Sequence, residues 1–141
     1  MRIVAIDVGE RRIGVGAADD RTGVAVPVAT IAAGDDPLEA IARLVEEQHA
    51  DELVVGLPLS LSGALGPQAQ RVQALVEALS ARLAIPVRTW DERLTTVQAG
   101  RRPPTAPTRR RRGRSVPGYA TPDALAAAII LQAFMDSRRP R

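Results

Sequence analysis

The sequence predicts an α/β fold in which a five-stranded mixed sheet is flanked by helices. Two observations lead to this prediction. Three short strand-like segments come first, separated only by brief turns, and from residue 36 onward helical patterns alternate with strand-like ones. Brief turns connect antiparallel strands, whereas a helix between two strands predicts a parallel crossover. A chain of 141 residues can bury one hydrophobic core, so we expect residues 1–141 to form a single domain.

The first three segments predict an antiparallel meander. Residues 2–8, "RIVAIDV", form an apolar run that contains a single acid, Asp7. Residues 13–18 alternate larger apolar side chains with glycine or alanine, and residues 24–28 alternate three valines. The proline of the third segment, Pro27, predicts an edge strand because proline has no N–H to donate to a neighbouring strand.

The rest of the chain predicts two crossover units and a closing helix. A helix over 36–48 begins with Asp36 as its N-cap, a strand covers 51–57, a helix covers 66–83 and a strand covers 85–90. The closing helix begins at 121, where Thr121 is the expected N-cap. Residues 101–119 hold four prolines, two glycines and seven arginines, a composition typical of a flexible loop.

The composition excludes several classes of protein. All 19 basic residues are arginine, so the lysine of a phosphate-binding P-loop and the amine of a Schiff-base enzyme are both missing. There is no cysteine for a disulfide or a thiolate zinc site, and His49 is the single histidine. No apolar run approaches the roughly 18 residues that span a bilayer, and the N-terminus lacks the pattern of a signal peptide. We therefore expect a cytoplasmic protein with no membrane partner.

Charge is distributed unevenly along the chain. Residues 1–99 carry 9 arginines and 14 acids, whereas residues 100–141 carry 10 arginines and 2 acids. Such a segregated positive region favours a polyanionic partner, although a solvated basic tail explains it equally well.

Acids at the ends of predicted elements are the candidate chemical groups. Asp7 lies near the end of the first strand, Asp91 and Glu92 follow the last one, and Asp123 lies in the first turn of the closing helix. If the first and last strands are parallel, Asp7 and Glu92 emerge at one edge of the sheet, where the closing helix can bring Asp123. Clustered carboxylates raise one another's pKa unless a divalent cation binds, and Mg²⁺ or Mn²⁺ would suit hydrolysis of a phosphodiester.

Each acid also has a purely structural explanation. Asp7 can form an Asx turn between hairpin strands. Asp91 and Glu92 can form a solvated strand end, and Asp123 can interact with the dipole of its helix. The residues taken singly leave both explanations open.

Four stretches together resemble one known family: "IDVGERRIGVGAAD", "VVGLPLSLSG", "WDERLTT" and "PDALAAAIILQ". They are similar to the YqgF/RuvX family of small ribonuclease-H-like nucleases, whose members are described as Holliday junction resolvases or pre-16S rRNA nucleases. The resemblance covers residues 1 to about 100 and resumes at about 121. It implies a ribonuclease-H-like fold with strand order 3-2-1-4-5, and a metal-dependent nuclease that acts on structured nucleic acid. Processing of the 5′ end of pre-16S rRNA is the favoured activity, junction resolution is the alternative, and a non-catalytic nucleic-acid-binding domain is a third.

The resemblance also implies roles for individual residues. Asp7, Glu92 and Asp123 would be the metal-binding catalytic acids. The residues expected to face nucleic acid, RNA in preference to branched DNA, are Arg12, Ser60, Ser62, Arg93, Thr95 and Thr96. The chain departs from the family pattern over 97–120, where an arginine cluster, Arg109, Arg110, Arg111 and Arg112, is expected to contact phosphates, unless this stretch is only a disordered linker. Junction resolution would require a homodimer, whereas RNA processing needs only a monomer.

Overall fold

Five strands form one mixed sheet in the order β3-β2-β1-β4-β5. The computed structural model describes the backbone of residues 1–99 and 121–138, and the side chains of residues 1–95 and 121–138. The antiparallel part consists of β1 (Arg2–Val8), β2 (Arg12–Asp19) and β3 (Val26–Ala32). The strands β4 (Glu52–Leu57) and β5 (Val87–Asp91) run parallel to β1. The predicted mixed sheet and its strand order are therefore confirmed. The predicted loop over 101–119 lies outside the described residues.

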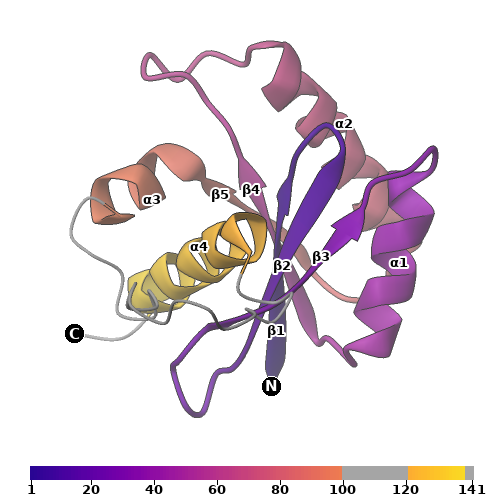
Figure 1. Ribbon diagram of the computed structural model, residues 1–141, viewed down its shortest axis with the longest axis vertical. Helices are drawn as coiled ribbons and strands as arrows, with labels where there is room; N and C mark the ends of the chain where they lie inside the picture. Colours follow the sequence, from indigo (N-terminus) through magenta and orange to yellow (C-terminus); the bar gives the residue numbers. More distant parts are fainter. Residues whose placement is uncertain (100–120, 139–141) are drawn as a thin grey trace, which may run out of the picture.

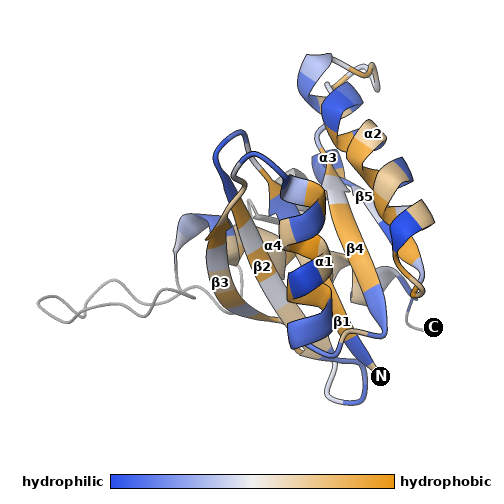
Figure 2. Cartoon of the chain, turned by 90° about the vertical axis from the view of Figure 1, so that its right-hand side faces the viewer, coloured by the Kyte–Doolittle hydropathy of each residue, from blue (hydrophilic) through white to orange (hydrophobic). Residues whose placement is uncertain are grey.

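Helices cover both faces of the sheet. Helices α1 (Pro37–Glu47) and α2 (Pro67–Arg82) lie side by side on one face, and α4 (Pro122–Arg138) crosses the other (Figures 1 and 2). Helix α3 (Glu92–Ala99) follows β5 without a turn, and periodicity alone does not predict it. Among the described residues, no helix is long and apolar enough to cross a membrane.

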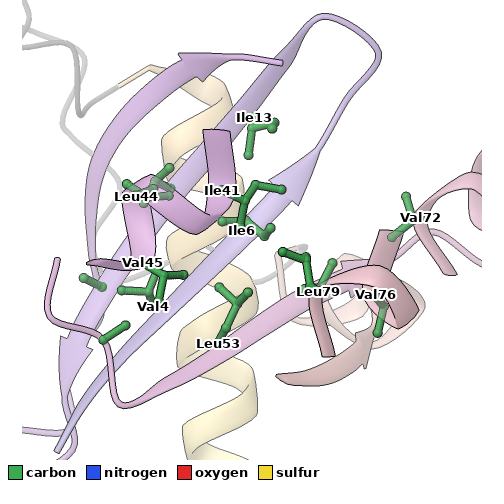
Figure 3. Close-up of a cluster of buried hydrophobic side chains, with 14 of the residues drawn as sticks. Val4, Ile6, Ile13, Ile41, Leu44, Val45, Leu53, Val72, Val76 and Leu79 are labelled. Carbon is green, nitrogen blue, oxygen red and sulfur yellow. The ribbon is translucent and has the colours of Figure 1, made fainter. Parts of the chain in front are cut away.

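Alternation along the strands divides the core into two layers. The layer under α1 and α2 contains Ile6, Ile41, Leu53 and Leu79, all fully buried (Figure 3). The layer under α4 contains the alternate positions of the same strands, such as Ile3. Asp7 follows the odd-numbered alternation of β1, so its side chain belongs to the face that α4 covers.

The predicted bounds of the third strand are wrong. The strand runs from Val26 to Ala32 rather than over 24–28, and Val24 precedes it as a half-exposed residue. The segment after Val28 mixes alanine, threonine and isoleucine and shows no alternation, but β2 is long enough to pair with it up to Ala32 opposite Arg12. Pairing with a neighbour, rather than local pattern, therefore determines where this strand ends. The strand does lie at an edge of the sheet, as its proline predicts.

Glycines on β2 bring α4 directly onto the sheet. A Cβ atom on Gly14 would lie 1.8 Å from the carbonyl oxygen of Asp123, and one on Gly16 would lie 2.8 Å from the backbone nitrogen of Ala128. The backbones of helix and strand therefore touch where a side chain would otherwise separate them. This contact fixes the N-terminal turn of α4 beside the end of β1.

A buried acid holds the other end of α4. The carboxylate of Glu52, at the start of β4, is 3% exposed. It accepts hydrogen bonds from Arg88 Nε of β5 and from Arg138 Nη1 at the end of α4, both at 2.9 Å. The glycine contact at the start of α4 and the Glu52 contact at its end together determine how this helix lies along the sheet.

Candidate active site

Asp7 and Glu92 meet at the edge of the sheet where the parallel strands end. Asp7 is the second-last residue of β1, and Glu92 is the first residue after β5, with β4 between the two strands. Their side chains share a hydrogen bond. A Cβ atom on Gly56 of β4 would lie 2.7 Å from Glu92 Oε2, so the glycine provides the space in which the Glu92 carboxylate lies. The expectation that these two acids converge is confirmed.

Burial makes both members of this pair weak acids. It raises the pKa of Glu92 to about 8, with further contributions from the charge of Asp7 and from the hydrogen bond with Asp7. The pKa of Asp7 is also raised, first by burial and then by the charge of Asp123, while its hydrogen bond with Glu92 acts in the opposite direction. With a pKa near 8, the Glu92 carboxyl is largely protonated at neutral pH.

Asp123 approaches this pair from α4. Thr121 caps the helix by accepting a hydrogen bond from the Ala124 N–H at 3.3 Å, and its hydroxyl lies 2.5 Å from that of Thr30 on β3. The Asp123 carboxylate accepts a hydrogen bond from Arg12 Nε at 2.9 Å. Its charge acts on Asp7, but within residues 1–95 and 121–138 no three acidic or histidine side chains are arranged, as they stand, to hold one ion.

Asp91 is engaged elsewhere, which distinguishes it from Glu92. Arg93 donates from its Nε to both carboxylate oxygens of Asp91 at 2.9 Å. These hydrogen bonds are the largest cause of the lowered pKa of Asp91. Arg93 also donates from Nη1 to the carbonyl of Leu61 at 3.2 Å, which joins the start of α3 to the loop between β4 and α2. Glu92, and not Asp91, is therefore the acid that faces Asp7.

The residues predicted to face nucleic acid lie in different settings. Arg12 is exposed but paired with an acid. Ser60 and Ser62 lie on the exposed β4–α2 loop, where their hydroxyls are 2.9 Å apart. Thr95 is buried and its hydroxyl donates to the carbonyl of Glu92 at 2.8 Å, so we propose no nucleic-acid contact for it. The remaining predicted contacts lie outside the described side chains: Thr96, Arg109, Arg110, Arg111 and Arg112.

The sequence prediction missed three contributors to the site. Gly14 and Gly56 provide the space for Asp123 and Glu92, and a signal for them existed, because a glycine inside a strand often marks a close backbone approach. The ion pair between Arg12 and Asp123 joins residues 111 positions apart, and no local pattern indicates it.

Solved structures share this fold over nearly the whole chain. RuvC of *Thermus thermophilus* in complex with a Holliday junction substrate is 14% identical, with a TM-score of 0.59, and the match covers 98% of this chain and 95% of that one. The fowlpox virus Holliday junction resolvase is 12% identical, with a TM-score of 0.58, and the match covers 97% and 99% of the two chains. The shared architecture is ribonuclease-H-like, as expected.

Sequence comparison identifies the family. A family model described as "RuvX: Holliday junction resolvase" matches residues 1–137. A relative from *Chloroflexus aurantiacus* is 44% identical over 97% of this chain and 88% of its own length. One from *Desulforudis audaxviator* is 36% identical over 99% of this chain and 96% of its own length. Both are named "Putative pre-16S rRNA nuclease". The chain belongs to the RuvX family.

Proposed function

We propose that this protein is a divalent-metal-dependent nuclease that processes the 5′ end of pre-16S rRNA in the cytoplasm. The observation that carries the proposal is the hydrogen-bonded pair of Asp7 and Glu92 at the end of the parallel strands, in a chain whose relatives are named "Putative pre-16S rRNA nuclease". Two carboxylates that retain a proton at neutral pH can exchange it for a metal ion, and phosphodiester hydrolysis on such a site needs neither histidine nor lysine.

Mg²⁺ or Mn²⁺ fits the donor set. The ligands on offer are all carboxylate oxygens, which these hard cations prefer. Gly56 leaves room for the Glu92 carboxylate over β4, and Asp7 is its direct partner. Asp7 and Glu92 would hold the ion, with Asp123 as the third acid. When bound, the ion supplies Lewis-acid polarisation of the scissile phosphate.

The chain's own residues favour recognition of the nucleic-acid backbone over recognition of bases. Among the described side chains, both aromatic ones serve the fold, because Trp90 and Phe134 pack edge to face with ring centroids 6.1 Å apart. Neither of these two rings is therefore placed to stack on a base. Arg12 and the loop held by Arg93 lie beside the acids, where they can contact phosphates and orient a strand.

The test is a cleavage assay with matched substrates. We would incubate the protein with Mg²⁺, Mn²⁺ or EDTA and with a pre-16S rRNA fragment, an unrelated single-stranded RNA or a four-way DNA junction. We expect metal-dependent cleavage of the rRNA precursor at its 5′ flank. Asp7→Asn should reduce the rate at least about 100-fold, because it removes a ligand and not merely a ligand's neighbour. Binding of every substrate without cleavage by the parent protein would show a non-catalytic domain instead.

A Holliday junction resolvase is the second candidate. The description of the matching family and the RuvC structures, which share the fold, favour it. A resolvase makes paired cuts and therefore acts as a symmetric dimer, whereas the rRNA activity is open to a monomer. Cleavage of the junction alone, by a protein whose molecular mass in solution is that of a dimer, would decide for the resolvase.

A further inference from the structure

Arg12 places a cation on the third acid of the site. Its Nε donates to Asp123 Oδ2 at 2.9 Å, across the contact between β2 and α4. The Arg12 side chain is 69% exposed and that of Asp123 is 35% exposed. The ion pair neutralises one of the negative charges that the three acids would otherwise present to a metal ion.

We propose that Arg12 pairs with Asp123 in the free protein and that a divalent ion displaces Arg12 from this carboxylate when it binds. Its guanidinium is then released to a phosphate of the incoming strand. Metal binding and nucleic-acid binding are thereby coupled, each favouring the other. The inference rests on the proposed function and makes Arg12 a positioning residue, which acts through Asp123 and through the substrate backbone.

The charges favour this exchange. A divalent ion held by Asp7 and Glu92 attracts the Asp123 carboxylate and repels the Arg12 guanidinium. An ion pair as exposed as this one favours the paired state by only about two- to fivefold, so a divalent ion competes with it readily. Two oxygens of a phosphate can accept hydrogen bonds from the planar guanidinium, so a phosphate is a suitable second partner for Arg12.

The surroundings confine the exchange to side chains. The backbone of Arg12 is fixed at two points. Its carbonyl accepts a hydrogen bond from Gly9 N at 2.9 Å, and Arg12 lies opposite Ala32 in the pairing of β2 with β3. The backbone of Asp123 rests on Gly14. The exposed Arg12 guanidinium can therefore swing away from the helix without a change of the backbone.

Calorimetric titration of Mn²⁺ without nucleic acid tests the competition. Arg12→Ala removes the competing cation, so we expect it to bind Mn²⁺ about two- to fivefold more tightly than the parent. Arg11→Ala is the matched control, since it removes the same charge from the adjacent exposed position. The same Arg12 variant should cleave RNA more slowly, so its metal affinity and its activity change in opposite directions.

RNA affinity in EDTA tests the release. Asp123→Asn frees Arg12 without any metal, so it should bind the rRNA fragment at least twofold more tightly than Asp136→Asn, which removes an exposed acid from the far end of α4. Adding Arg12→Ala to Asp123→Asn should abolish that gain.

Two outcomes separate this inference from the proposed function. Equal Mn²⁺ affinity of Arg12→Ala and Arg11→Ala would overturn the exchange, while metal-dependent cleavage by the parent would leave the nuclease proposal intact. A parent protein that neither binds Mn²⁺ nor cleaves any substrate would overturn both.

Discussion

Glu92 holds its proton far above the usual range because its carboxyl is half-buried beside Asp7. The residue follows the last strand immediately, so the backbone of β5 determines where the carboxyl lies. The energetic penalty of ionising it is set by burial and by the neighbouring acid, both of which come from the fold.

This shift predicts how the stability of the metal-free protein depends on pH. The folded state binds the Glu92 proton more tightly than the unfolded state, in which the pKa of this carboxyl is 4.5. The stabilisation is therefore fully present below about pH 4.5 and is lost as the pH rises through about 8. Urea unfolding in EDTA should show the free energy of unfolding falling over this window.

Glu92→Gln is the control for that prediction. The amide does not ionise, so the decline between these pH values should flatten in the variant. A decline of equal steepness in the variant and the parent would show that another group is responsible.

At the scale of elements, α4 approaches the site because β2 carries glycine where a side chain would collide. Gly14→Ala would place a Cβ atom 1.8 Å from the Asp123 carbonyl, with backbone on both sides of the clash. We expect a loss of about 1–3 kcal/mol in stability and a lower Mn²⁺ affinity, because the first turn of α4 must shift. Thermal unfolding and metal titration measure the two effects.

Gly66→Ala is the matched control for Gly14→Ala. It is a glycine with ordinary negative φ at the start of α2, and nothing lies within 4 Å of the added Cβ. Its stability and metal affinity should remain close to those of the parent. If the two variants behaved alike, the close approach of α4 to β2 would not be what positions Asp123.

The hydrogen bonds of Glu52 also position elements, because they join β4 to β5 and to the end of α4. Glu52→Gln removes the charge that Arg88 and Arg138 share, and we expect a loss of about 1–3 kcal/mol in chemical unfolding. Glu39→Gln is the comparison, because Glu39 pairs with Arg82 at the surface, where both side chains are about half exposed. That variant should lose less than about 1 kcal/mol, and a similar loss in both would mean that the burial of Glu52 has no special effect.

At the scale of the whole molecule, positive charge is concentrated in the last 42 residues. If Arg109 to Arg112 contact phosphates, replacing all four by glutamine should weaken RNA binding and reduce the slope of log affinity against log salt by up to about 3. Binding measured at several salt concentrations gives this slope. An unchanged slope would assign these arginines, which lie outside the described residues, to a solvated segment.

Much of this architecture can be predicted from local pattern. The apolar run of β1, the helix signals at Asp36 and Pro37, and the alternation of helix with strand lead to the observed sheet. The end of β3 cannot be predicted in this way, because pairing with β2 determines it. For the site, the convergence of Asp7 with Glu92 follows from two parallel strands ending at one edge, but the engagement of Asp91 by Arg93 does not.

The sequence alone determined the mixed sheet and placed acids at the ends of its elements, because periodicity and residue chemistry are local properties. The strand order and the choice of Asp7, Glu92 and Asp123 were implied by the resemblance to a known family. Only the tertiary structure decided that Glu92 rather than Asp91 meets Asp7, that burial keeps a proton between them, and that Arg12 holds Asp123. Each of these depends on distance and burial among residues far apart in the chain, which no local pattern records.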